Sequence, residues 1–333
     1  MNFVKPFAVA GAMLALASAP AIAQQDWKLA SAAQPGSVLV GFVDETAQKI
    51  TTNTAGTIKV ERQFIGSEQE IVQQVVRGRI QLGSVSYTGA SVLVPEAALL
   101  NMPYLWTSNE ERDYVTDNHA LPVMKKIYEA KGLVILGLGD VGWNDVVCKK
   151  ACLSPDDVKG MKVRVSPASS SKLFWTSLQA NGVQMPLSEL FPALQSGLVE
   201  GADLPFLYYI TTPAAQSAPH YVMTRHLHHG STFVANKALW DKLTPEQRTI
   251  IIAARPDIVR VRAEVEATEK PKMDEFVKKG GFVHVLTPDQ RKKWAALVEP
   301  HQQKMVDEIG GQSKELWAAI QKGKKEFAAR GGK

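Results

Sequence analysis

The sequence predicts an α/β protein of two lobes, each an open sheet flanked by helices. Strand and helix patterns alternate over residues 27–85, which is typical of an open sheet. A second α/β pattern begins after residues 139–144. The chain has 333 residues, of which 45% are hydrophobic and 21% charged, so it is long enough for two cores rather than one.

The first 23 residues have the features of a secretory signal peptide. Lys5 precedes an apolar run over 7–17, and Ala21-Ile22-Ala23 forms a small-residue cleavage site before Gln24. We therefore expect a periplasmic protein whose signal peptide, residues 1–23, is cleaved near Ala23. A membrane anchor is the alternative, but it needs about 20 apolar residues and does not normally end in such a tail.

The charge of the chain excludes one class of partner. There are 38 basic and 33 acidic residues, for a formal net charge of +5. A mild basic excess helps to attract anions, but here it is dispersed and not interleaved with aromatic residues. We therefore expect no nucleic-acid partner.

The first half of the chain alternates strands and helices. We expect strands near 28–30, over 57–64 and over 82–85, and helices over 36–53 and 68–77. Ligands of open α/β sheets lie beyond the carboxyl ends of strands, so Ser86 and Tyr87 are candidate site residues. A surface turn with an exposed tyrosine is the alternative.

A crossing between the lobes is expected at 139–144. A helix to about 130 and a strand over 133–138 precede it. Trp143 and Asn144 would then lie near the hinge and the cleft, although Trp143 could equally fill a core. The strand-like segment 221–235 is expected to return the chain to the first lobe.

Two strand ends of the second lobe supply the main candidate site. Residues 161–165 alternate as a strand that Pro167 ends, which leaves Arg164 at its end. The guanidinium is a planar fork of donors that suits a carboxylate. A helix over 187–195 leads into a strand that ends at Asp203 and Leu204, and Phe206 begins an aromatic run that could form a cleft wall or fill a core. We expect the two strand ends to face each other across a cleft and to hold a small organic anion.

Cys148 and Cys152 are the only cysteines. In an oxidising compartment a disulfide is favoured over a free pair. The spacing is not the C-x-x-C of a redox centre, and the second pair of ligands that a zinc site needs is missing. We therefore predict neither a redox centre nor a zinc site.

The sequence gives less support to an enzymatic function than to a binding function. His226, His228 and His229 lie close together, but no carboxylate or cysteine stands at ligand spacing, and no metal is predicted. The serines at 169–171 are better explained as a helix N-cap than as a source of a nucleophile that would pair with His226 or His228. Phosphate-binding loops of the known patterns do not occur, so we expect no cofactor and no enzymatic activity.

Several segments together resemble the solute-binding subunits of tripartite ATP-independent periplasmic (TRAP) transporters, of the DctP type. The most specific combination is SPDDVKGMKVRV at 154–165 followed by QSGLVEGADLP at 195–205; FIGSEQE at 64–70 adds to it. The resemblance covers nearly the whole mature chain. It implies a clamshell with a long C-terminal helix packed across both lobes, and a membrane permease as partner. An ABC-type or chemosensory binding protein for a small organic anion is the alternative.

The resemblance also sets the expected domains. Lobe I would comprise 24–141 and 230–270, lobe II 142–229 and 271–297, and 298–333 would form a C-terminal helical segment. We expect a monomer rather than a dimer.

The resemblance suggests a ligand class through the residues that depart from it. Arg164 matches the arginine that typically pairs with the ligand carboxylate. Asn144 falls where many members have a second arginine, Leu204 where they often have asparagine, and Ser86 where some have glutamate. With Trp143, Tyr87 and Phe206 nearby, we predict a monocarboxylate with an apolar or aromatic body rather than a sugar acid or a dicarboxylate.

Overall fold

The protein is described by a computed structural model that covers residues 24–332. The predicted signal peptide, residues 1–23, lies outside the described residues. None of the helices formed within 24–332 combines the length and the apolar character needed to cross a bilayer.

Within residues 24–332, nine strands form one sheet, in the order β2-β1-β3-β8-β4-β7-β5-β6, with β9 paired to β8. Neighbouring strands within β1–β3 and within β5–β7 run parallel, and β4 and β8 pair antiparallel between these two groups. The strands are β1 (Gln25–Ser31), β2 (Ile58–Phe64), β3 (Leu82–Ser86), β4 (Leu133–Cys148), β5 (Lys162–Val165), β6 (Asn181–Gln184), β7 (Gly201–Pro205), β8 (His220–Asn236) and β9 (Phe282–Val285).

Two long strands belong to both lobes. β4 has 16 residues and β8 has 17. The C-terminal part of β8 pairs with β3 of the first lobe, and the C-terminal part of β4 pairs with β7 of the second lobe. Register shifts interrupt their pairing, one of them between Asp140 and Trp143, within the predicted crossing. The two-lobed α/β fold is therefore confirmed, with one difference: the crossing segments are themselves strands, so the two sheets are continuous. The exact lobe boundaries stay a prediction.

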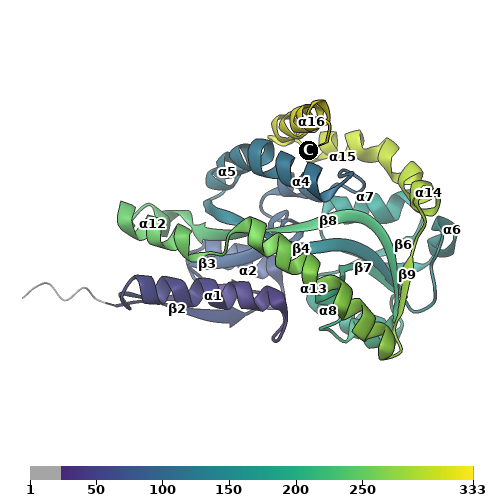
Figure 1. Cartoon of the computed structure of the whole chain (residues 1–333), viewed down its shortest axis with the longest axis horizontal. Helices are drawn as coiled ribbons and strands as arrows, with labels where there is room; N and C mark the ends of the chain where they lie inside the picture. The colour runs from purple at the N-terminus through teal and green to yellow at the C-terminus, as the bar shows by residue number, and fades with distance from the viewer. Residues whose placement is uncertain (1–23, 333) are drawn as a thin grey trace, which may run out of the picture.

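Helices cover both faces of this sheet (Figure 1). Side chains cap several of their first turns, as Ser37 does for α1 and Ser67 for α2. The helices are α1 (Val38–Asn53), α2 (Glu68–Val76), α3 (Tyr87–Ala90), α4 (Asn109–Val115), α5 (Leu121–Ala130), α6 (Pro155–Val158), α7 (Ser169–Ser177), α8 (Leu187–Ser196), α9 (Phe206–Tyr209), α10 (Ala214–Ser217), α11 (Lys237–Trp240), α12 (Pro245–Ala254), α13 (Ile258–Lys278), α14 (Pro288–Val298), α15 (Gln302–Ile309) and α16 (Ser313–Ala329).

The long helix that crosses both lobes is α13 (Figure 1). Asp257 caps it, and it continues through Pro271. It packs against α1 on one side of the cleft, against α9 and β9 on the other, and against β4. The final helix, α16, packs instead on α4 and α5 of the first lobe.

Cys148 and Cys152 form a disulfide, as the sequence predicts. Both side chains are buried in a core that also contains Trp175 and Trp294. The bond therefore closes a short loop between the end of β4 and the segment that precedes α6.

Candidate ligand-binding site

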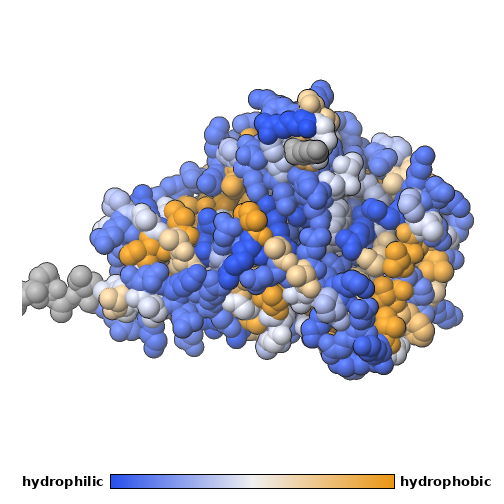
Figure 2. Space-filling view, in the orientation of Figure 1, coloured by the Kyte–Doolittle hydropathy of each residue, from blue (hydrophilic) through white to orange (hydrophobic). Residues whose placement is uncertain are grey.

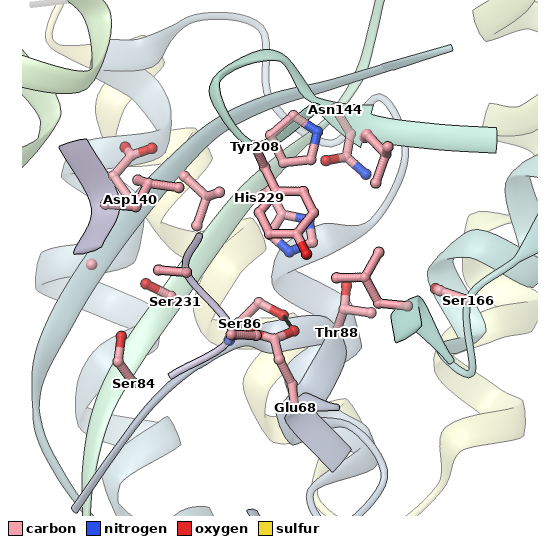
Figure 3. A pocket seen from close by; sticks show the side chains of 18 of the residues that line it. Glu68, Ser84, Ser86, Thr88, Asp140, Asn144, Ser166, Tyr208, His229 and Ser231 are labelled. Carbon is pink, nitrogen blue, oxygen red and sulfur yellow. Dashed lines mark hydrogen bonds between the residues drawn. The ribbon is translucent and has the colours of Figure 1, made fainter. Parts of the chain in front are cut away.

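A cavity of about 100 Å³ lies between the two lobes, beside the bulged middle of β4 and β8. A bound water needs roughly 10–15 Å³ of such volume, so this space suits a small molecule of about ten non-hydrogen atoms or fewer. Figure 3 shows polar side chains from both lobes facing the cavity. The first lobe contributes Ser31, Leu39, Phe42, Glu68, Gln69, Ser84, Ser86 and Thr88; the second contributes Arg164, Ser166, Ser170, Ser171, Leu187, Asp203, Leu204, Pro205 and Tyr208; the crossing strands contribute Asp140, Val141, Asn144, Leu227, His229 and Ser231.

Arg164 is the penultimate residue of β5 and is buried, with 5% of its surface exposed. Its Nε donates to the carbonyl of Met185 at 3.1 Å, which fixes the direction of the side chain. Within residues 24–332 no carboxylate lies within 4.0 Å of its guanidinium. Burial lowers the pKa of Arg164, and the negative charge of Asp203 opposes this. A buried arginine that lacks a close ion pair is suited to receive an anion.

Asp203 is the middle residue of β7 and is held by neutral donors. It accepts hydrogen bonds from Asn144 Nδ2 at 2.8 Å and from Trp175 Nε1 at 3.0 Å. Nε2 of His226 lies 3.7 Å from Oδ2, beyond ordinary hydrogen-bond length. Burial alone would raise the pKa of Asp203, but His226, the charge of Arg164 and the Trp175 bond together hold it below its usual value. Asp203 is therefore an ionised, fixed group beside the cavity.

Glu68 is the first residue of α2 and reaches the end of β3. Its carboxyl accepts from the backbone N–H and the hydroxyl of Ser86, which are 2.8 Å and 2.5 Å away. Gly89 allows this approach, because a Cβ at that position would lie 2.4 Å from Cβ of Glu68. Burial raises the pKa of Glu68 despite the two bonds. Figure 3 shows Glu68 and Ser86 side by side on one wall of the cavity.

Three buried polar atoms on the cavity wall have no hydrogen-bond partner within residues 24–332: Asn144 Oδ1, Ser170 Oγ and His229 Nδ1. Burial lowers the pKa of His229 to about 4, so its imidazole is neutral near pH 7. Buried polar atoms are nearly always satisfied in native proteins. Unmet atoms gathered in one cavity indicate a site that a ligand or water completes.

The structure brings five of the eight predicted site residues to this cavity: Arg164, Asn144, Ser86, Leu204 and Asp203. Their role in binding stays a prediction. The other three, Tyr87, Trp143 and Phe206, do not line it.

Each of these three aromatic residues has a different place. Tyr87 turns into the core of the first lobe, where its ring lies over Gly230; a Cβ at Gly230 would be 2.4 Å from Cε2 of Tyr87. Phe206 packs edge-on against Tyr221 and Phe276, with ring centroids 5.0 Å and 6.0 Å away.

Trp143 points to the opposite side of the crossing strands. It lines a second, open groove between α13 and β9, and its Nε1 donates to Asn109 Oδ1 at 3.0 Å. Figure 2 shows apolar side chains over β9 beside this groove, where Phe282 and Val285 are exposed. Trp143 follows the bulge that begins at Asp140, which alters the strand's alternation at this point.

Sequence reasoning missed other cavity residues, among them Glu68, Tyr208 and His229. Tyr208 lies two residues beyond Phe206 in α9, so the aromatic run did supply a cleft wall, through a different ring. Glu68 was part of the segment that carried the family resemblance, and its position at the start of a helix near a strand end was the available signal. The three histidines separate: His226 stacks on Phe174, His228 contacts Asp140, and His229 faces the cavity.

No group of three or more metal-ligating side chains occurs within the described part of the chain. Ser171, from the serine run at the start of α7, accepts from the backbone N–H of Ser166 at 3.0 Å and lies 3.4 Å from Asp203. These serines thus belong to the polar wall of the cavity.

A closed cleft between two lobes that share a sheet, lined by one buried arginine and several unmet polar atoms, defines a solute-binding protein of the clamshell class. The chain belongs to the bacterial extracellular solute-binding protein family 7 (DctP), whose model matches residues 29–309. The predicted resemblance to the solute-binding subunits of TRAP transporters is thereby confirmed. This is a family of periplasmic solute-binding proteins, not of enzymes.

Similar proteins of known name bind different acids. The chain is 25% identical over 276 residues to the C4-dicarboxylate-binding periplasmic protein DctP of Rhodobacter capsulatus, covering 81% of this chain and 82% of that protein. It is also 25% identical to the 2,3-diketo-L-gulonate-binding periplasmic protein YiaO of Escherichia coli, covering 69% and 70%. A TRAP periplasmic solute-binding protein of Sulfurospirillum deleyianum with bound succinate has a TM-score of 0.81 at 21% identity, covering 89% of this chain and 99% of that one. Another, of Roseobacter denitrificans with bound β-D-glucuronate, has a TM-score of 0.83 at 21% identity with the same coverage. These structures support the fold.

Proposed function

We propose that this protein captures a small monocarboxylate with a partly apolar body in the interlobe cavity and delivers it to a TRAP membrane permease. The observation that carries the proposal is the charge of the cavity wall. Arg164 is its only cationic side chain among the described residues, and His229 is neutral near pH 7. One arginine fork can bind one carboxylate.

A second carboxylate on the ligand would lack a partner of opposite charge. The carboxyl groups of the wall, among the described residues, belong to Glu68, Asp140 and Asp203. A like charge facing them in a water-poor cavity is unfavourable. This disfavours a dicarboxylate.

The apolar part of the ligand would contact a different set of residues from the one expected. The expected aromatic residues Tyr87, Trp143 and Phe206 do not line the cavity, whereas Leu39, Phe42, Leu187, Leu204, Leu227 and Val261 do. Together they supply the apolar part of the cavity wall. A cavity of about 100 Å³ also favours a compact acid over a bulky sugar acid.

A bound ligand would favour the closed arrangement of the two lobes, because some contacts exist only when the lobes meet. Gln34 of the first lobe donates to the hydroxyl of Tyr208 of the second at 3.2 Å. A carboxylate bound to Arg164 while touching first-lobe residues adds contacts that exist only in the closed state. A ligand shifts the lobe equilibrium by this difference in affinity.

The test is a calorimetric and thermal-shift screen of mature protein that has been refolded to remove copurified ligand. The panel contains small mono-, di- and keto-carboxylates and sugar acids. We expect one class of monocarboxylate to bind and Arg164→Met to weaken it strongly. Loss of a desolvated charge pair costs about 2–5 kcal/mol, or roughly 30-fold to several thousandfold in Kd.

Arg255→Met is the matched control, because Arg255 is a half-buried arginine outside the cavity, with its Nε unpartnered within 24–332. Its affinity for the acid should equal that of the unmodified protein. Binding of succinate or a sugar acid with failure of every monocarboxylate would refute the ligand class. Normal binding by Arg164→Met would remove Arg164 from the site.

Two further parts of the proposal concern location and assembly. We infer that residues 1–23 are removed near Ala23 on export, which mass spectrometry of the periplasmic protein would test. We also infer a monomer, which light scattering of the mature protein would test. A gene for a TRAP permease next to this gene would support the partner, and an ABC permease or a chemoreceptor gene in its place would favour the alternative.

A further inference from the structure

The amide of Asn144 has a fixed orientation in the cavity. Its Nδ2 lies 2.8 Å from Oδ2 of Asp203, and an ionised carboxylate can only accept hydrogen bonds. The reverse orientation would place two acceptors against each other. Oδ1 of Asn144 must therefore point away from Asp203, and it is buried without a partner among residues 24–332.

This atom sets a requirement on the ligand. A carbonyl oxygen is an acceptor, so it needs an N–H or O–H donor. A simple carboxylate with a hydrocarbon body has none. A carboxylate bound at Arg164 thus leaves this oxygen to a water or to a second group on the ligand.

The charges around Asn144 favour a positively charged donor. Arg164 balances Asp203 on the second lobe, and Asp140 has its own cation in Arg112, whose Nη2 is 3.5 Å from Oδ2. Among the described residues, Glu68 receives hydrogen bonds only from the backbone N–H and the hydroxyl of Ser86, and both of these donors are neutral. A bound carboxylate therefore adds negative charge to a wall that has no further cation to offset it. A cationic group on the same ligand would offset that charge.

We propose that the ligand is a zwitterion, a small acid that carries a protonated amine whose N–H donates to Oδ1 of Asn144 beside Asp203. This inference rests on the proposed function, because it assumes that Arg164 binds the ligand carboxylate. It adds the second recognition element and so narrows the class from monocarboxylates to amino acids and related amino-substituted acids.

The test compares acids that differ only in the group that would meet Asn144. One series is 3-methylbutanoate with its 2-amino, 2-hydroxy and 2-oxo derivatives, and a second is propanoate with the same three derivatives. Butanoate with its 4-amino and 4-hydroxy derivatives covers a donor farther from the carboxylate. In the series that fits the cavity, the amino acid should bind about tenfold to a hundredfold more tightly than the unsubstituted acid, as expected for a hydrogen bond to a charged group. The oxo acid should bind least, because its added oxygen is a second acceptor.

Asn144→Leu tests the residue itself, with Asn53→Leu as the matched control on the exposed end of α1. In Asn144→Leu the preference for the amino acid over the unsubstituted acid should fall at least tenfold. Asn53→Leu should leave the preference unchanged. The comparison of ligands on the unmodified protein stands even where Asn144→Leu fails to fold.

The outcomes separate this inference from the function on which it rests. Tightest binding of the hydroxy acid, or equal binding of the amino, unsubstituted and oxo acids, overturns the zwitterion and leaves the monocarboxylate receptor in place. Binding of the amino acid that survives unchanged in Asn144→Leu overturns the role of Asn144. Failure of every acid to bind the unmodified protein removes the proposed function and the inference together.

Discussion

Replacing His228 should change how the stability of the protein depends on pH. His228 is buried in β8, with 5% of its surface exposed, and its Nε2 lies 3.2 Å from Oδ1 of Asp140. Burial lowers its pKa to about 4; the charge of Asp140 opposes this, and Arg112 and Arg262 reinforce it. The unfolded chain has an ordinary histidine pKa near 6.5.

The sign follows from the proton count in each state. Between pH 6.5 and about 4, the unfolded chain binds a proton at His228 that the folded protein does not. The stability that neutral His228 contributes is complete above pH 6.5 and is lost as the pH falls through this window. A pKa difference of about 2.5 corresponds to about 3 kcal/mol over the whole window.

Urea unfolding followed by circular dichroism would measure this effect. The unfolding free energy of both proteins is compared at about pH 7 and about pH 4.5. The decrease between these two pH values should be roughly 2–3 kcal/mol smaller for His228→Gln than for the unmodified protein. Asp145→Asn is a control of opposite sign: burial raises the pKa of Asp145 to about 7, so ionised Asp145 reduces stability as the pH rises from about 4 to 7. Asp145→Asn should therefore lose more stability on acidification than the unmodified protein. Parallel pH profiles for His228→Gln and the unmodified protein would refute the reasoning.

Two other predictions concern the disulfide and the placement of the aromatic residues. The bond between Cys148 and Cys152 closes a very short loop, so its reduction should lower the unfolding free energy by only about 2 kcal/mol. Ligand affinity should not change, and a large loss of affinity on reduction would contradict this prediction. In titration calorimetry, Trp143→Ala should alter ligand affinity less than about threefold, because Trp143 lies outside the cavity. Phe42→Ala removes a buried side chain from the cavity wall and should weaken binding by about tenfold or more. The reverse order of effects would return Trp143 to the site.

Much of the fold could be predicted from local sequence. The strand that ends at Arg164 and the strand that ends at Asp203 and Leu204 have clear alternation and stop signals, and both ends do meet at one cavity. The long strand over 221–235 was also recognisable despite its polar residues. What local patterns do not reveal is that β4 and β8 run without a break through both lobes, because strand continuity depends on pairing partners far away in sequence.

The direction of individual side chains was harder to predict than the position of the backbone. Tyr87 begins a helical turn next to Ser86, yet its ring turns toward Gly230, some 140 residues later, where the missing Cβ leaves room for it. Trp143 and Asn144 are adjacent in β4 and therefore face opposite sides of the sheet, as successive residues of a strand do. Which of the two faces the cavity depends on the register shift between Asp140 and Trp143, and neither residue carries a local sign of that shift.

The shared strands have a consequence for how the two lobes can exist. β8 lies between β3 of the first lobe and β4, and β4 lies between β8 and β7 of the second, so neither lobe can complete its sheet without both crossing segments. A fragment that ends before β8 would expose the open edges of β3 and β4. Because the two lobes share these strands, we expect neither lobe to fold as an independent module.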